Sequence, residues 1–407
     1  MRILIVSMDF WPDSSSGSQH ITDLAEALVL RGHNVNVFTS RSDYQDPSRF
    51  YAPEETYRGI HIRRLKQTTF KKSNKIGRIL NVFTFNLSLL GSLLFIKSGN
   101  FDLIIGITTP PLSVFFDAVV ADFKKIRFCV WAMDFQPELS IIAGYMNKLS
   151  PLVLILSALN KYALRNTDLI ITLDKYMAKY LSSQKIEANK ISIIPVWPVL
   201  ESSYDGVHFE NPFRRKYDFN DKIVIMYSGN HSVVHPLDTL LMAAKELKGD
   251  KRFLFVFVGG GVRKEEVTNF KNNHKLNNIL QLPYQERSKI HISLSAADIH
   301  VVVHGNGCTG YTHPNKIYGS MLVCRPILYI GQHPSHITDV LDQCPGNLSV
   351  EHGQVERLVV LLREFETTPI KERNKIGIQN MEFVKNNFNK DNLLDKFISA
   401  LESMPPR

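Results

Sequence analysis

One segment, residues 304–316, combines the residue types that suit a diphosphate. It reads His-Gly-Asn-Gly-Cys-Thr-Gly-Tyr-Thr-His-Pro-Asn-Lys. Its three glycines keep backbone N–H groups accessible to a ligand, and Lys316 adds a positive charge where a helix is expected to begin, near Asn315. A loop this rich in glycine is more often functional than not in a stable domain. The segment therefore predicts a phosphate-binding turn.

A second turn of the same kind follows the apolar run Ile223–Tyr227. Gly229 leaves room for a ligand beside Asn230, and the helix expected next offers free N–H groups to an anion. The apolar run after that helix, Phe253–Val258, also ends on glycines, residues 259–261. The two runs thus predict neighbouring strands whose ends could approach the same ligand.

Carboxylates and small residues mark two turns in the first half of the chain. Asp134 and Glu138 flank Pro137, a residue suited to the first position of a helix. A carboxylate there could orient or deprotonate a hydroxyl group, or the pair could simply cap the helix. The loop Ser7–Ser18 contains Gly17 and precedes a helical pattern. It could admit an anion at that helix N-terminus, or be a plain flexible turn.

The elements that position these turns follow a strand–helix–strand order that occurs twice. Ile3–Val6 and Val35–Thr39 flank the first helical pattern, and Ile223–Tyr227 and Phe253–Val258 flank the second. Two such openings predict an α/β fold of two doubly wound, Rossmann-like domains facing across a cleft, although one large open sheet is the alternative. The predicted N-terminal domain spans residues 1–200 and the C-terminal domain 201–385. Residues 386–407 are expected to form a helix that packs back on the N-terminal domain. Further strands are expected at 103–108, 127–133, 169–172, 278–282, 299–303 and 326–329, and helices at about 155–166 and 371–402.

Composition excludes several classes of protein. The 407 residues are 44% hydrophobic and 21% charged, which is ordinary globular usage and not that of a disordered chain. No apolar stretch of membrane-spanning length lacks polar residues, so a multi-spanning membrane protein is not expected. The apolar start is too short for a signal-peptide core. The four cysteines, Cys129, Cys308, Cys324 and Cys344, lack ligand spacing such as C-x-x-C, which predicts reduced thiols in a cytoplasmic protein.

The net charge of +9 is concentrated in one stretch. Between Glu55 and Asp102 the chain has nine basic residues and no acidic one. This stretch predicts contact with an anionic membrane or substrate, whereas a solvated basic loop is the alternative. Nucleic acid is not expected, because aromatic residues are not interleaved with the basic run. The candidate membrane or acceptor surface comprises Arg63, Arg64, Lys71, Lys72, Lys75 and Arg78.

The apolar segment Ile79–Ile96 lies within this basic stretch. Asn81, Thr84, Ser88 and Ser92 form one polar stripe along it at helical spacing. A lipid-spanning helix has little use for such a stripe. Burial in the protein core is the favoured prediction, and a helix lying in a membrane interface is the sharper alternative.

Together these strings resemble the large retaining family four of glycosyltransferases with the GT-B fold, and within it the branch that acts on bacterial surface polysaccharides. The resemblance covers nearly the whole chain, and it rests on the order and spacing of strings that are each weak alone. They are "RGHNVNVFTS" at 31–40, "DFQPE" at 134–138, "IPVWP" at 194–198, "MYSGNHSVVHPLDTLLMAA" at 226–244, "FVFVGGG" at 255–261 and "HPNKIYGSMLVCRPILYIG" at 313–331.

The resemblance implies sugar transfer from a nucleoside diphosphate donor, with retention at the anomeric carbon, no cofactor and no metal. It is consistent with the absence of a D-x-D pair from the sequence. The second domain would bind the donor, and the first would bind a glycan or lipid-linked acceptor beside the catalytic candidates Asp134 and Glu138. The implied donor contacts are Gly17, Gly229, Asn230, His235, Gly260, Tyr284, Gly310, Tyr311, Asn315 and Lys316.

The chain also departs from the family pattern. The family commonly has Arg and Lys where this sequence has Asn230 and His235, and two glutamates where it has Tyr311 and Gly319. The favoured hypothesis remains a cytoplasmic glycosyltransferase at the inner face of the cell membrane. The alternatives are a non-hydrolysing nucleotide-sugar epimerase, and a nucleotide-sugar-binding protein that has lost catalysis.

Overall fold

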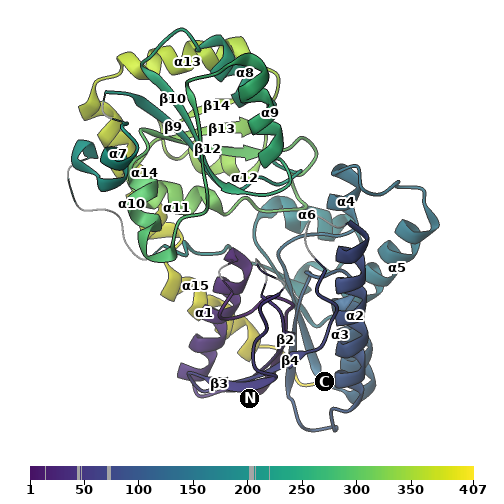
Figure 1. Ribbon diagram of the computed structural model, residues 1–407. Helices are drawn as coiled ribbons and strands as arrows, with labels where there is room; N and C mark the ends of the chain where they lie inside the picture. Colours follow the sequence, from purple (N-terminus) through teal and green to yellow (C-terminus); the bar gives the residue numbers. More distant parts are fainter. Residues whose placement is uncertain are drawn as a thin grey trace. The chain divides into compact units, whose positions relative to one another are not determined.

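The computed structural model describes residues 1–13, 15–43, 46, 48–70, 75–200, 206, 208–219 and 221–407. The chain divides into two compact units. Unit 1 contains residues 1–196, 310–313 and 390–407, and unit 2 contains residues 197–309 and 314–389. Each unit is an α/β structure built on its own sheet of mainly parallel strands (Figure 1).

Unit 1 is an eight-stranded sheet in the order β3-β4-β2-β1-β5-β6-β7-β8, in which only the edge strand β3 is antiparallel to its neighbour. Helices α1 and α15 lie on one side of this sheet, and α2, α3 and α5 lie on the other (Figure 1). The strands are β1 Arg2–Val6, β2 Asn34–Ser40, β3 Glu54–Tyr57, β4 Ile60–Leu65, β5 Leu103–Ile107, β6 Arg127–Ala132, β7 Leu169–Thr172 and β8 Ile191–Ile193. The helices are α1 Ser16–Leu30, α2 Lys75–Leu94, α3 Ser113–Lys124, α4 Glu138–Ile142, α5 Pro151–Arg165, α6 Lys175–Ser183, α15 Lys390–Glu402 and the 3₁₀ turn η1 Ala188–Lys190.

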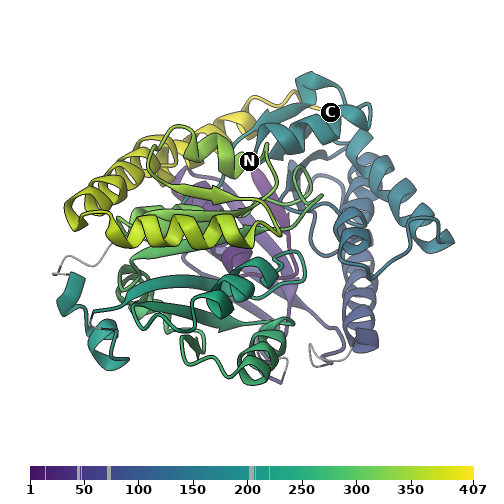
Figure 2. The same ribbon diagram turned by 90° about the horizontal axis from the view of Figure 1, so that it is seen from above.

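Unit 2 is a six-stranded parallel sheet in the order β11-β10-β9-β12-β13-β14 with helices on both faces (Figures 1 and 2). Its strands are β9 Ile223–Asn230, β10 Phe253–Gly260, β11 Ile279–Leu282, β12 Ile299–His304, β13 Ile327–Gly331 and β14 Leu348–Val350. Its helices are α7 Pro212–Lys216, α8 Asp238–Glu246, α9 Lys264–His274, α10 Ile290–Ser295, α11 Lys316–Leu322, α12 His336–Leu341, α13 Val355–Thr367 and α14 Ile370–Asn387, with 3₁₀ turns η2 His208–Glu210 and η3 Arg287–Lys289.

The continuous apolar strands predicted from the sequence are buried on both faces. Along β9, Ile225 and Tyr227 pack into the core under α8, α9 and α13, whereas Val224 and Met226 pack into the core on the opposite face. All four side chains are fully buried. This alternation is what a central parallel strand requires, because successive side chains point to opposite faces of the sheet.

The order of strands sets where ligands can bind. In unit 2, β9 lies between β10 and β12, and in unit 1, β1 lies between β2 and β5. Each first strand is therefore the point at which the direction of strand addition reverses. Ligands of open α/β sheets bind beyond the carboxyl ends of the strands at such a point. The Gly229 turn follows β9, and the Ser7–Ser18 loop follows β1.

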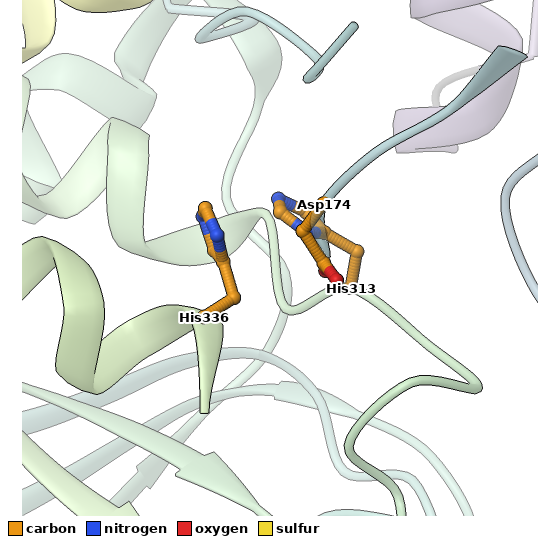
Figure 3. A group of neighbouring side chains, drawn as sticks. All are labelled: Asp174, His313 and His336. Atoms are coloured by element: carbon orange, nitrogen blue, oxygen red, sulfur yellow. The ribbon is translucent and has the colours of Figure 1, made fainter. Parts of the chain in front are cut away.

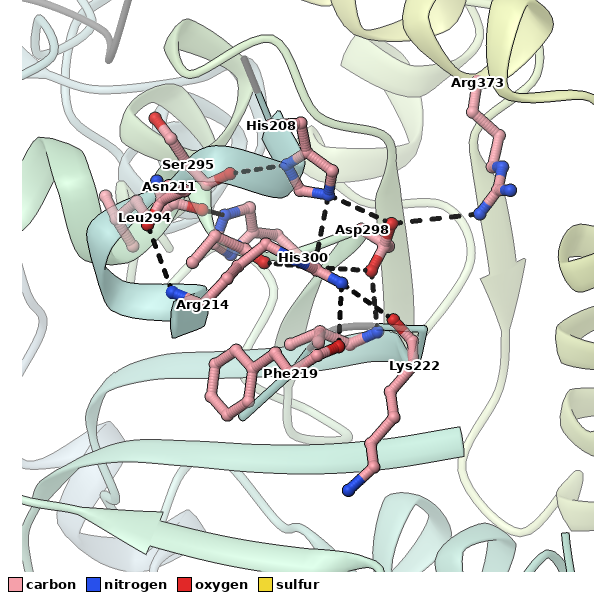
Figure 4. Close-up of polar contacts among 12 residues, drawn as sticks. His208, Asn211, Arg214, Phe219, Lys222, Leu294, Ser295, Asp298, His300 and Arg373 are labelled. Carbon is pink, nitrogen blue, oxygen red and sulfur yellow. Dashed lines mark hydrogen bonds and ion pairs between the residues drawn. The ribbon is translucent and has the colours of Figure 1, made fainter. Parts of the chain in front are cut away.

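A buried polar network ties the chain that enters unit 2 to the sheet (Figure 4). The guanidinium of Arg214 in α7 donates to Asp298 Oδ2 at 2.9 Å and to the carbonyl oxygens of Phe219 and Lys222 at 3.0 Å each. Asp298 also accepts from the Val224 N–H at 2.9 Å. Burial acts to raise the pKa of Asp298, but the hydrogen bond with His208, the charge of Arg214 and the Val224 N–H lower it to about 2. These contacts fix the start of β9, which leads to the Gly229 turn, and loss of either charged partner would leave the other buried and unpaired.

The sequence predicted most strands to within two residues, but it missed β3, β4, β8 and β14 and merged two helices. The hairpin β3–β4 was not expected, and its strand β4 carries Arg63 and Arg64 within the basic stretch. The helical pattern at 371–402 is two helices, α14 and α15, separated at Phe388. Residues of α15 belong to unit 1, whereas α14 belongs to unit 2.

Candidate active site

Glycine turns at the ends of β9 and β10 form a surface of exposed backbone in unit 2. Gly229 pairs with Gly259 across these strands, at φ values of +130° and +126°. A Cβ atom on Gly259 would lie only 2.2 Å from the Gly229 carbonyl oxygen, and one on Gly261 would lie 2.4 Å from Asn230 Oδ1. Side chains cannot fit at these positions, so only glycine allows the two strand ends to lie this close.

Lys316 faces this surface from the first residue of α11. Its Nζ donates to the Tyr227 hydroxyl at 2.8 Å and lies 4.1 Å from the centre of the Tyr227 ring. The same Nζ would be 3.7 Å from a Cβ on Gly229. Burial lowers the pKa of Lys316 to about 7, and no ion pair to it occurs within the described part of the chain. A cation held this way is stabilised by an anionic ligand.

Histidine and tyrosine side chains complete the surroundings of Lys316. Burial lowers the pKa of His231 to about 4 and that of His235 well below its usual value, and the charge of Lys316 acts in the same direction. Both imidazoles are therefore neutral near neutral pH. Tyr284 is half exposed, and its hydroxyl donates to the Gly260 carbonyl at 3.1 Å. Its ring lies beside the glycine turn, where it could stack on a flat group of a ligand.

Asp134 follows β6 in unit 1 and is held from both sides. The N–H groups of Met133 and Asp134 donate to Thr108 Oγ1 at 3.1 and 3.2 Å. Asp134 also forms a β-bridge with Thr312, and burial raises its carboxyl pKa, opposed by a hydrogen bond from Thr312 and the charge of His313. A carboxylate whose pKa is raised toward neutrality is suited to accept a proton from a hydroxyl group.

Glu138, unlike Asp134, is hydrogen-bonded to a tyrosine hydroxyl. It begins α4, and its Oε1 accepts a hydrogen bond from the Tyr180 hydroxyl at 2.5 Å. The Tyr180 ring packs against Tyr311 with ring centres 4.9 Å apart. Phe135 N–H donates to the Tyr311 carbonyl at 2.8 Å. Tyr311 therefore packs beside the Asp134–Glu138 turn in unit 1.

The glycine-rich segment that was predicted as one phosphate-binding turn is divided between the units. Gly310 and Tyr311 belong to unit 1, whereas Asn315 and Lys316 belong to unit 2. A Cβ on Gly310 would lie 3.1 Å from the Tyr176 carbonyl oxygen of α6. Among the residues predicted to bind the donor, the structure brings together Gly229, Asn230, His235, Gly260, Tyr284 and Lys316. Gly17 lies at the start of α1 in unit 1, with no atom within 4 Å of a Cβ placed there.

A buried pair that sequence reasoning missed lies next to this segment (Figure 3). His313 Nδ1 and Asp174 Oδ2 are 2.8 Å apart, and both side chains are buried. Asp174 also caps α6 by accepting the N–H groups of Tyr176 and Met177. His336, drawn in the same figure, belongs to unit 2 and bonds the Tyr318 hydroxyl there. Asp174 follows the end of β7, as Asp134 follows the end of β6. The pattern of a carboxylate just after an apolar strand could therefore have identified Asp174 from the sequence.

The predicted basic surface needs one correction. Arg64 is buried, because its guanidinium forms an ion pair with Glu55 of β3 and donates to the Trp11 carbonyl. It therefore does not belong to an exposed surface. Arg63 and Arg78 are exposed. Lys71 and Lys72 lie outside the described residues, as does the side chain of Lys75.

Known proteins share a domain model and the fold with this chain. Residues 17–197 match the family model of the glycosyl transferase 4-like domain. One relative is a protein of Escherichia coli K12 named colanic acid biosynthesis glycosyl transferase WcaI. It is 21% identical to this chain, and the alignment covers 98% of this chain and 100% of WcaI. Residues 17–197 thus match a glycosyl transferase 4-like domain, and the chain has the GT-B fold of glycosyltransferases.

Solved structures show the same fold at low sequence identity. Sucrose-phosphate synthase from Thermosynechococcus elongatus has a TM-score of 0.76 at 15% identity, covering 99% of this chain and 98% of that one. Anabaena HepE, solved with UDP and glucose, has a TM-score of 0.73 at 12% identity, covering 99% of this chain and all of that one. The chain thus combines the GT-B fold with a Gly229 turn that has Asn230 and His235 where family-four glycosyltransferases commonly have Arg and Lys.

Proposed function

We propose that this glycosyltransferase transfers a sugar, with retention and without a metal, from a nucleoside diphosphate sugar to a glycan or lipid-linked acceptor of bacterial surface polysaccharide. The observation that carries the proposal is the ammonium of Lys316, which faces the glycine turn of unit 2 without a carboxylate partner among the described residues. We place the enzyme in the cytoplasm, at the inner face of the cell membrane.

Each half of the machinery has a defined role in this proposal. Lys316 and the N–H groups near Gly229 hold the diphosphate, and their fixed positive ends stabilise the charge that develops on it as the sugar bond breaks. This replaces the cation that a D-x-D carboxylate pair would hold. The bond from the anomeric carbon to the diphosphate breaks, and the acceptor oxygen attacks from the same face, which retains the configuration. Asp134 accepts the proton of the acceptor hydroxyl as this new bond forms.

The relatives support the class of donor and the pathway. HepE was solved with UDP and glucose, which favours a nucleoside diphosphate sugar as donor. WcaI is named for colanic acid biosynthesis, which favours a surface polysaccharide as product. The replacement of the family Arg and Lys by Asn230 and His235 leaves Lys316 as the principal cation of the described turn.

Incubation of the purified protein with a panel of nucleoside diphosphate sugars and lipid-linked or glycan acceptors tests the proposal. We expect nucleoside diphosphate release that depends on the acceptor and persists in a chelator. Conversion of a donor without acceptor would support an epimerase instead. Tight binding of donor with no turnover across the panel would support a protein that has lost catalysis.

The pKa of Lys316 predicts how donor affinity depends on pH. Below its pKa of about 7 the side chain is a cation, and above it the cation is lost from the free enzyme. Calorimetric titration with UDP and GDP from about pH 6 to about pH 9 should therefore show affinity falling as pH rises, by up to about tenfold per unit. His231 and His235 are already neutral over this range, so they do not contribute. A Lys316→Met variant should lose this dependence, and a wild-type affinity that is flat over the range would contradict the assignment.

A further inference from the structure

Helix α2 of unit 1 has apolar side chains on two faces, one buried in the protein and the other exposed. Ile79 is 66% exposed, Phe83 53% and Leu87 52%, and they follow one another at spacings of four residues. This spacing places them along one face of the helix. Other exposed apolar residues in and just after α2 are Ile76, Leu80, Leu94 and Phe95. The prediction that this segment is a core helix is therefore wrong for this face.

The polar stripe of the same helix is turned toward the protein. Asn81 accepts from the Thr68 hydroxyl and the Phe70 N–H at 3.0 Å each. Thr84 accepts from the Thr68 N–H at 2.9 Å, and Ser88 donates to the Lys66 carbonyl at 2.6 Å. A surface helix in contact with water usually exposes its polar residues and buries its apolar residues. In α2 the polar stripe bonds to the protein and a second apolar face is left exposed beside the buried one, so the exposed face lacks the polar residues that contact with water favours.

Exposed basic residues flank this apolar stripe. Lys66 and Arg78 lie at its beginning and Lys97 at its end, and the described residues show no ion pair to any of the three. Residues 56–101 contain no acidic residue. Basic side chains at the margins of an apolar helix face extend to the phosphate groups of a bilayer while the apolar side chains enter its boundary.

We propose that the outer face of α2 docks this enzyme on the surface of an anionic phospholipid membrane. The docked helix lies in the membrane interface. Ile76–Leu94 is long and apolar enough to span a bilayer, and 28% of it is buried. However, its polar stripe bonds residues 66–70, and α3 packs against it, so the helix is held as part of unit 1.

Charge distinguishes the membrane from a second copy of the chain as the occupant of this face. Two copies joined through α2 would bring two acid-free basic stretches together, and like charges repel. Anionic lipid instead neutralises each basic residue near its surface, which favours binding by about 1 kcal/mol per residue.

Docking of α2 on the membrane also has a consequence for the position of the acceptor. This consequence rests on the proposed function. Helix α2 begins after β4, and Asp134 follows β6. Because these strands are parallel members of one sheet, their carboxyl ends lie along the same edge. Docking through the first turns of α2 would bring this edge toward the lipid surface, which suits an acceptor carried on a lipid.

Vesicle sedimentation tests the dock without any nucleotide sugar, so its outcome is independent of the proposed function. Wild-type protein should pellet with vesicles of phosphatidylcholine and phosphatidylglycerol, and less with phosphatidylcholine alone. The double variant Ile79→Glu, Phe83→Glu should lose about tenfold or more in partitioning, because two carboxylates would enter the apolar boundary. The matched control is Leu30→Glu, on α1, where Leu30 is 88% exposed. It should bind as wild type does.

Four outcomes would overturn the dock. In the first, wild-type protein stays in the supernatant with the anionic vesicles. In the second, the folded double variant pellets as wild type does. In the third, cell membranes keep the protein after an alkaline carbonate wash, which would mean that α2 spans the membrane. The fourth is a dimer that the double variant converts to a monomer, seen by analytical ultracentrifugation without vesicle binding. Circular dichroism checks that the variants are folded.

Discussion

Replacing Asp134 with asparagine is expected to lower the turnover number by about 100- to 10,000-fold while leaving the affinity for a nucleoside diphosphate nearly unchanged. Asparagine keeps the shape of the side chain and its place after β6, but it cannot accept a proton. The contacts of the backbone at this turn, to Thr108 Oγ1, do not involve the carboxyl group and should persist.

The measurement is a steady-state assay of acceptor-dependent nucleoside diphosphate release, combined with a binding titration. The matched control is Asp122→Asn, which removes an exposed carboxylate of α3 in the same unit and should leave turnover as in wild type. If Asp134→Asn retains full turnover, the general base lies elsewhere in unit 1. Because burial raises the pKa of Asp134, wild-type turnover should also fall toward acidic pH as this carboxylate becomes protonated.

Asp134 is preferred to Glu138 as the base for a structural reason. Glu138 already accepts a short hydrogen bond from Tyr180, which in turn packs against Tyr311. Glu138 is therefore positioned to hold these two rings beside the Asp134 turn. The sequence proposed both residues as catalytic, and from these contacts we propose Asp134 as the base and Glu138 as a positioning residue.

Local sequence patterns were enough to predict the strands that lead to the site. Runs such as Ile223–Tyr227 are apolar without interruption, and only a strand buried on both faces requires that. The glycine turns at their ends were also readable, since Gly229 and Gly259 occupy conformations that favour glycine. These features depend on neighbours in the chain or on the strand next to it.

Features that depend on distant partners were not readable. His313 meets Asp174, which is 139 positions away, and no local pattern links them. Arg64 looked like a surface base because its partner Glu55 lies on a hairpin that the sequence did not reveal. The polar stripe of α2 was compatible with a buried helix or an interfacial one, and its bonds to residues 66–70 could not be read from the helical pattern alone.

Replacing Lys316 with alanine is expected to weaken the binding of a nucleoside diphosphate by about 5- to 150-fold, which corresponds to about 1–3 kcal/mol for a charge-assisted hydrogen bond. The loss should appear for UDP or GDP alone, since the contact is to phosphate and not to sugar or base. The variant should fold, because its ammonium is partly buried without an ion pair among the described residues, so removing it relieves a desolvation cost.

Calorimetric titration compares Lys316→Ala with Lys248→Ala, a matched control that removes an exposed lysine of the same unit. The control should bind as wild type does. Equal affinities for Lys316→Ala and wild type would show that the glycine turn of unit 2 does not bind the diphosphate. The pattern across both assays separates the proposed donor turn of unit 2 from the proposed base of unit 1. If one turn binds the donor and a separate residue is the acceptor base, Lys316→Ala should lose affinity and Asp134→Asn should lose turnover. The reason is that Lys316 contacts the diphosphate before the sugar bond breaks, whereas Asp134 acts only as that bond breaks.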